Sequence, residues 1–376
     1  MNVATTASRQ LFSRAGDEVF SGWDHILSHL RTVQDNTVEV PLNHLSAVAD
    51  RDSVYAQFSA DGGDTYATRM NDWSFNQMTK FTEVRGVYSA LNALSPQTSA
   101  SALNELLVRN GAQDRDRVAL VHLSPKPTDE DTMPHDPVSR AFYSTSYNRV
   151  GDLEVFKHFH HLSEQFGYEP AGRFAGKRGG LAPVKPEASG LYRGDRSSFG
   201  FVANELGRID IDNSSLYHAV MWGNSEVGKE TLWFQDVLYN YICGNHMIYS
   251  PKRMRMTKHR HTGAVRSVLM EATRMFESVD GEREDRRLKT QEMFSKASTT
   301  IFAQTRKLVE KKLASSLTKR DAMLSANYLE HPFAYPKNPI SVWGVAQAIT
   351  LASQEKVYVD ESRAMDKVAG NMLAQL

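Results

Sequence analysis

Apolar residues recur at helical spacing in three segments of the first half of the chain. These segments cover residues 73–78, 103–108 and 152–166. In the third segment, Asp152 is suited to cap the start of a helix and Gly167 to end it. The spacing therefore predicts three amphipathic helices.

Short apolar runs bounded by turn residues predict strands. They cover residues 38–41, 117–123, 199–202, 207–212 and 215–222. Residues 191–192 and 199–202 flank a glycine-containing turn, which is typical of a hairpin. A helix is expected over 42–48, where Leu42, Leu45 and Val48 follow the first strand. A second one, fully buried, is expected over 231–243, which is apolar on nearly every side.

Helical spacing dominates the last third of the chain, over residues 264–320 and 339–376, with Gly281 as a break. Strands followed by helices predict an α+β fold: a mixed or antiparallel sheet core with packed helices and a mostly helical C-terminal third. We expect a partly flexible segment at 1–37, an α+β core at 38–263, and a helical region at 264–376 that packs on the core or mediates oligomerisation.

The amino-acid composition limits the classes of protein to which this chain can belong. With 376 residues and 41% hydrophobic positions, the chain can fold around a large core. The 44 basic residues balance the 44 acidic ones, so a preference for nucleic acid must come from local clusters. Cys243 is the single cysteine, which excludes an internal disulfide and fits a reducing compartment. No apolar run approaches the roughly 20 residues that cross a bilayer, so we expect a cytoplasmic protein without a membrane partner.

Residues 223–231 nearly match the phosphate-binding P-loop, G-x-x-x-x-G-K-[ST]. Gly223, Gly228 and Lys229 stand at motif positions, but Glu230 stands where the motif needs a hydroxyl for Mg²⁺. The segment is better interpreted as a turn between a strand and the buried helix, with Glu226 and Glu230 near the helix start and Lys229 as a possible phosphate contact. An NTP-binding protein that uses Lys229 remains an alternative.

The strongest local signal is charge. Residues 237–270 contain no acidic residue. They contain a basic set: Lys252, Arg253, Arg255, Lys258, Arg260 and His261. Residues 253–261 alternate as a strand with cations on both faces, which favours a surface that meets solvent or a polyanion. The alternative is a solvated edge strand whose cations prevent aggregation.

A second basic segment lies at 171–194, a glycine-rich stretch that predicts a mobile loop. Its cations include Arg173, Lys177 and Arg178. Together with the first set and the tyrosines 239, 241 and 249, it predicts a groove for phosphates with faces for base stacking.

Metal and catalytic patterns are weak. The histidines 158, 160 and 161 include no i, i+4 pair, and Asp210, Asp212 and Asn213 lack the glycine and distal glutamate of a calcium loop. No Ser-His-Asp or paired-carboxylate pattern stands out. We expect no metal, no cofactor and no catalytic residue.

Several motifs together resemble a phage- and plasmid-borne family of unknown function that includes the YafZ and YfjQ prophage proteins. They are residues 141–149, the Asn-Ser-Glu-Val-Gly of 224–228, 243–246, 260–263 and 341–350, within a match over about 40–370. His246 departs from the glycine of the family pattern, which puts the turn geometry there in doubt. The resemblance implies a mobile-element protein in the host cytoplasm, and it implies no established activity.

The combined prediction is a phage-type nucleic-acid-binding protein. We expect it to bind single-stranded DNA without catalysis, as a homo-oligomer that assists annealing or recombination. Besides the NTP-binding protein, an anti-defence or structural module that binds an acidic protein remains an alternative.

Overall fold

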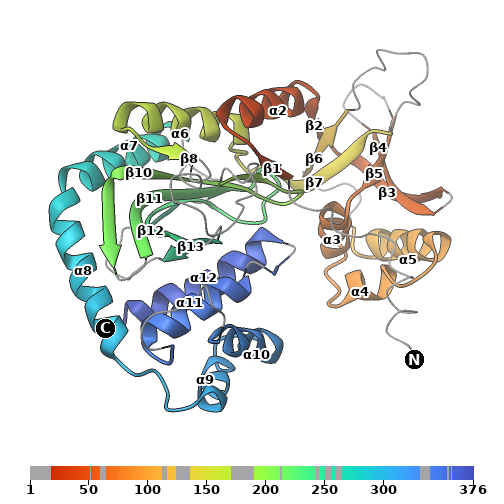
Figure 1. The fold of residues 1–376 in the computed structure, drawn as a ribbon. Helices are drawn as coiled ribbons and strands as arrows, with labels where there is room; N and C mark the ends of the chain where they lie inside the picture. The colour runs from red at the N-terminus through yellow and green to blue at the C-terminus, as the bar shows by residue number, and fades with distance from the viewer. Residues whose placement is uncertain are drawn as a thin grey trace.

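The computed structural model describes most of the chain as two sheets with packed helices (Figure 1). The described ranges are residues 18–50, 52–59, 65–111, 117–123, 136–170, 190–211, 214–242, 245–249, 256–259, 265–330, 339–353, 355–356 and 358–376. The α+β class is confirmed, because one sheet is antiparallel, the other is mixed, and the described elements after the last strand are helices.

The larger sheet, sheet A, has eight strands, and its described pairings are antiparallel. Their order is β1-β9-β10-β11-β12-β13, with β8 beside β10 and β14 beside β12. The bounds are β1 (Glu18–Phe20), β8 (Glu169–Pro170), β9 (Leu191–Arg193), β10 (Ser198–Ile211), β11 (Ser214–Asn224), β12 (Leu232–Ile242), β13 (Asn245–Tyr249) and β14 (Met256–His259). The hairpin predicted for residues 191–202 is confirmed as β9–β10, and the strand predicted at 215–222 as β11.

The smaller sheet, sheet B, has six strands in the order β2-β6-β7-β5-β4-β3, with β5 and β7 parallel. The bounds are β2 (Thr37–Pro41), β3 (Asn43–Asp50), β4 (Ser53–Ser59), β5 (Thr65–Met70), β6 (Arg117–His122) and β7 (Val138–Ser144). Its core is completed by α3 (Asp72–Lys80), α4 (Val87–Leu91) and α5 (Pro96–Arg109). Helices α3 and α5 confirm the predictions for 73–78 and 103–108.

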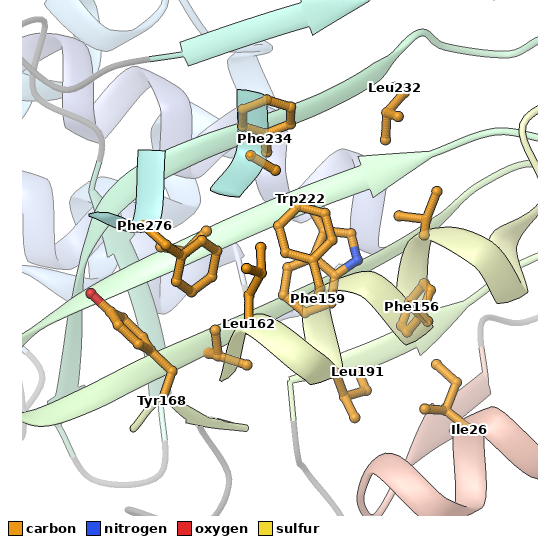
Figure 2. Packing of buried hydrophobic residues seen from close by; sticks show 14 of the residues in the cluster. Ile26, Phe156, Phe159, Leu162, Tyr168, Leu191, Trp222, Leu232, Phe234 and Phe276 are labelled. Atoms are coloured by element: carbon orange, nitrogen blue, oxygen red, sulfur yellow. The ribbon is translucent and has the colours of Figure 1, made fainter. Parts of the chain in front are cut away.

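One face of sheet A is covered by α2 (Trp23–Asp35), α6 (Asp152–Phe166) and α7 (Val265–Gly281) (Figure 1). At the centre of this core, the Trp222 ring stacks on Phe159, with the ring centroids 4.3 Å apart (Figure 2). The Trp222 ring also stacks on Trp23 of α2, with centroids 5.8 Å apart. Helix α6 has the predicted bounds, although Gly151 occupies the cap position and Asp152 is its first residue. Part of the predicted N-terminal segment thus belongs to the fold, because α2 buries Ile26 in this core.

The opposite face of sheet A is covered by C-terminal helices (Figure 1). The helices that follow α7 are α8 (Arg283–Thr299), α9 (Arg306–Leu313), α10 (Lys319–Tyr328), α11 (Val342–Ser353) and α12 (Val359–Leu373). Arg363 of α12 lies 4.2 Å from the ring centroid of Trp233 and 5.4 Å from that of Phe199, so α12 lies over β10 and β12. Gly281 ends α7 as expected.

Two predicted helices are wrong. The segment 231–243 contains strand β12, and 42–48 falls largely in strand β3. In β12, Leu232 and Phe234 pack under α6 and α7, whereas Trp233 and Val237 pack on the other face. Because helices cover both faces of sheet A, the strand is apolar on both sides and its alternation is hidden.

Candidate functional site

The structure describes few of the predicted nucleic-acid-binding residues. Residues Lys252, Arg253, Arg255, Arg260, His261, Arg173, Lys177 and Arg178 lie outside the described ranges. Lys258 lies in β14, where the backbone is described and pairs with Trp233. The strand predicted for 253–261 is therefore confirmed over 256–259.

Strand β14 is at an edge of sheet A, since its described pairing is with β12 alone. It runs antiparallel to the first residues of β12, with His259 opposite Leu232. Lys229 lies in the loop that leads directly into Leu232. The register thus brings Lys258 and Lys229 to the same end of sheet A.

The near P-loop is the connection between β11 and β12, and these strands form an antiparallel hairpin. Gly223 is still part of β11 and pairs with Trp233, and Gly228 adopts a φ of 76° in the turn. A P-loop instead joins a strand to a helix, whose first N–H groups bind the phosphates. Residues 225–231, termed here the hairpin loop, therefore lack the geometry of a nucleotide-binding P-loop.

The hairpin loop is fixed to its surroundings by buried hydrogen bonds. Asn224, just before it, donates to the carbonyl of Val150 at 2.8 Å and to Asp152 Oδ1 at 2.8 Å. Ser225 Oγ donates to the carbonyl of Arg196 at 2.6 Å and accepts the backbone N–H of Lys229 at 2.9 Å. These contacts hold the backbone that carries Lys229 in one conformation.

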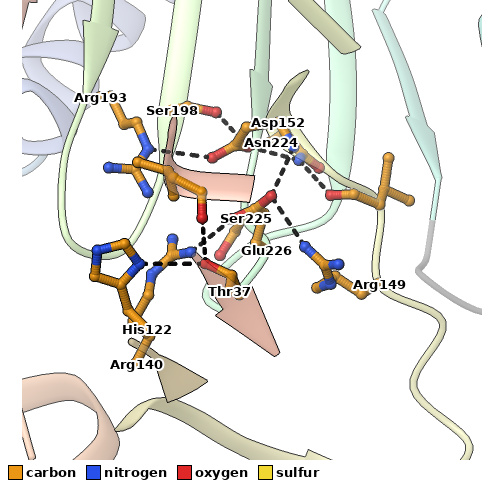
Figure 3. A network of polar contacts seen from close by, with 12 residues as sticks. Thr37, His122, Arg140, Arg149, Asp152, Arg193, Ser198, Asn224, Ser225 and Glu226 are labelled. Carbon is orange, nitrogen blue, oxygen red and sulfur yellow. Dashed lines mark hydrogen bonds and ion pairs between the residues drawn. The ribbon is translucent and has the colours of Figure 1, made fainter. Parts of the chain in front are cut away.

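Glu226 connects the hairpin loop to sheet B through a buried ion-pair network (Figure 3). Its Oε2 accepts Arg140 Nη1, from β7, at 2.9 Å, and its Oε1 accepts Arg149 Nη1 at 3.3 Å and the backbone N–H of Asp152 at 2.9 Å. The side chain of Glu226 is 8% exposed. Arg193 lies on the other side, with Nε 3.8 Å from Asp152 Oδ2.

The two acids of this network differ in protonation. Burial, reinforced by the charge of Glu226, raises the pKa of Asp152 to about 6. Burial also acts to raise the pKa of Glu226, but the three arginines outweigh it and hold this pKa below its ordinary value. Glu226 is thus the firmly ionised member. Its predicted place near a helix start is wrong, because β12 follows the hairpin loop.

Lys229 itself is exposed. Its Nζ lies 5.2 Å from the ring centroid of Trp73, the second residue of α3. Trp73 Nε1 donates to the carbonyl of Val227 at 2.9 Å, so ring and hairpin loop are joined directly. Glu230 lies apart from this contact, since its carboxylate accepts Trp233 Nε1 at 3.0 Å and pairs with Arg363 at 3.5 Å.

Sequence reasoning missed Glu226, Arg140 and Trp73 as partners of this loop. Trp73 and Val227 are 154 positions apart, and Arg140 and Glu226 are 86 apart. The one available signal was the Asn-Ser-Glu-Val-Gly segment, whose side chains from Asn224 to Val227 all prove to be buried.

Other classes of site find no support in the described residues. No group of three or more His, Cys, Asp or Glu side chains there is arranged to hold a metal ion. None of the helices described has the length and apolarity to span a membrane. His158, one of the three clustered histidines, hydrogen-bonds instead to the carbonyl of Leu269 at 2.9 Å.

Comparison with protein-family models, curated proteins and solved structures gave no match to this chain. The resemblance to the phage-borne family stays a prediction from its motifs.

Proposed function

We propose that this chain is a phage-type nucleic-acid-binding protein that holds single-stranded DNA without catalysis and assists annealing or recombination as a homo-oligomer. The observation that carries the proposal is the register of β14, which brings Lys258 to the end of sheet A where the hairpin loop carries Lys229. Lys258 and Lys229, which belong to separate motifs in the sequence, thereby lie in one region of the fold.

The remaining basic residues extend this region along the chain. Arg253 and Arg255 immediately precede β14, and Arg260 and His261 immediately follow it. Cations in such a row bind a phosphate backbone by displacing its counterions, whatever the base sequence. The basic loop with Arg173, Lys177 and Arg178 would close over the strand in this proposal.

The test is a salt titration of binding to a fluorescein-labelled single-stranded thymidine oligonucleotide, followed by anisotropy. Affinity is expected to fall steeply with salt, and Arg253→Ala/Arg255→Ala is expected to weaken it and flatten the salt dependence by roughly 0.7 per lost phosphate contact. Lys311→Ala, at an exposed position of α9, is the control and is expected to match the wild type.

Absence of wild-type binding at low salt would overturn the proposal. A duplex competitor of the same length separates a preference for single strands from general attraction to phosphate. Sedimentation of the purified protein, with and without the oligonucleotide, tests the oligomer.

A further inference from the structure

We infer that Trp73, Lys80 and Lys229 form a phosphate subsite where α3 meets the hairpin loop. The inference rests on the proposed function and adds two residues, Trp73 and Lys80, to the surface that contacts the nucleic-acid backbone. The ligand class is the phosphate of a phosphodiester.

The two lysines gather on one aromatic ring from distant parts of the chain. Lys80 Nζ lies 5.3 Å from the Trp73 centroid, and Lys229 Nζ lies 5.2 Å from it. Trp73 and Lys80 are both in α3, whereas Lys229 is in the hairpin loop between β11 and β12. Within about 6 Å of a tryptophan ring a cation is attracted by the ring's quadrupole, so the Trp73 ring attracts both ammonium groups.

Among the side chains that the structure describes, neither ammonium is paired with a carboxylate. Within the described ranges, no carboxylate lies within ion-pair distance of Lys80 or Lys229. The acids that neighbour these residues in sequence are used elsewhere: Asp72 pairs with Arg196 and accepts the Tyr88 hydroxyl, and Glu230 contacts Trp233 and Arg363.

A third cation, Arg196, has its Cζ 5.6 Å from the same centroid, but Asp72 and Asp195 balance its charge. Within the described part of the chain, the two lysine charges beside this ring therefore have no paired carboxylate. In the proposed subsite, an anion that contacts both ammonium groups offsets their repulsion and gains two charge-assisted contacts.

Hydrogen bonds fix the Trp73 ring and the backbone of Lys229 in place. The Trp73 side chain is buried, and its Nε1 and Gln77 Nε2 both donate to the carbonyl of Val227, each at 2.9 Å. The backbone of Lys229 is fixed by its bond to Ser225 Oγ. Because these groups are already ordered, binding loses less conformational entropy than binding to free lysine side chains. Both lysine side chains remain exposed to a ligand.

The experiment uses the full chain with Lys80→Met/Lys229→Met, which keeps the apolar stems and removes both charges. Lys80→Arg/Lys229→Arg keeps the charge, and Lys311→Met is the control. Binding of the thymidine oligonucleotide is measured by anisotropy across a salt series, and inorganic phosphate is titrated by calorimetry in parallel. Thermal unfolding verifies that the variants are folded.

We expect the double methionine variant to bind the oligonucleotide at least about tenfold more weakly at low salt, because it loses both charge-assisted contacts to the phosphate. Its salt slope is expected to fall by about 0.7, and the arginine variant is expected to restore both. If the wild type binds and the methionine variant behaves like Lys311→Met, the subsite is wrong while the proposed function stands.

If the wild type binds no oligonucleotide, the proposed function is wrong, and the phosphate titration decides the subsite alone. Heat from inorganic phosphate that disappears in the methionine variant then supports a site for free phosphate. Absence of that heat overturns the subsite as well.

Discussion

Glu226 accepts the backbone N–H of Asp152 at 2.9 Å, so the hairpin loop of sheet A is bonded to the first residue of α6. The same carboxylate binds Arg140 of β7, which belongs to sheet B. A single side chain thus connects two sheets and a helix. The rigid base beneath Lys229 depends on it.

Replacing Glu226 by glutamine is expected to destabilise the fold by about 3 kcal/mol, because the partly buried Arg140 and Arg149 lose the negative charge that they share. Urea unfolding at pH 7 measures this. Glu39→Gln is a matched control, since Glu39 Oε1 also pairs with Arg149, at 2.6 Å, but its side chain is 44% exposed. An exposed pair contributes at most about 1 kcal/mol. Equal losses in the two variants would contradict the central role of Glu226.

Gly223 has a packing role that differs from the one a P-loop would give it. A Cβ at Gly223 would lie 2.5 Å from Trp233 Cζ2, inside van der Waals contact. Gly223→Ala is therefore expected to lower the unfolding free energy by about 1–3 kcal/mol. Gly281→Ala is the control, because no atom lies within 4 Å of its Cβ position and alanine favours the helix. If Gly223→Ala unfolds like the wild type but alters Mg-ATP binding, the packing role is wrong.

The sequence of a segment was enough to predict a helix where one face of that helix is polar. The bounds of α6 could be predicted because its apolar stripe and Gly167 lie within the segment itself. Strand β12 could not be predicted from its own segment. Its second apolar face is covered by α12, whose Arg363 lies over Trp233 although the two residues are far apart in the sequence. A fully buried strand and a buried helix share the same apolar run, and length with aromatic content is the remaining local guide.

The candidate site shows the same limit. Lys229 could be singled out because it stands in a near motif. Lys80 carries no such pattern, and its relation to Lys229 exists only because Trp73 bonds to the hairpin loop. The function of the basic residues around β14 stays a prediction.

Asp366 is expected to make the protein less stable as pH rises. Its side chain is buried on α12 and accepts Ser353 Oγ at 2.7 Å. Burial raises the pKa of this carboxyl from 3.8 to about 8, although Ser353 and Arg363 oppose the rise. Between these two pH values, Asp366 is ionised in the unfolded chain but not in the folded chain. The free energy of unfolding therefore falls by up to about 1.4 kcal/mol per pH unit as pH rises.

Asp366→Asn keeps an acceptor for Ser353 and removes the titration. The variant is expected to be more stable than the wild type at pH 8, with a gap that narrows toward pH 4. Urea midpoints at several pH values measure the gap. Asp285→Asn, at an exposed position of α8, is the control. A gap that stays constant with pH would show that packing, not ionisation, separates the variant from the wild type.

His218 is expected to act in the opposite direction, at acidic pH. It is 2% exposed in β11, between Asn204 and Leu238 on the neighbouring strands, and neither ring nitrogen has a hydrogen-bond partner within the described structure. Burial lowers its pKa from 6.5 to about 4, and the charges of Arg286 and Arg283 add to this. Between these two pH values, His218 therefore binds a proton in the unfolded chain but not in the folded chain.

The contribution of neutral His218 is complete above pH 6.5 and is lost as pH falls toward 4, by up to about 1.4 kcal/mol per unit. His218→Phe keeps a buried ring without a titratable group, so its stability is expected to decline less than that of the wild type over this window. Exposed His161→Gln is expected to follow the wild type. Unfolding curves at pH 7, 5.5 and 4.5 test this prediction. Parallel losses in wild type and His218→Phe would assign the acid sensitivity to another group.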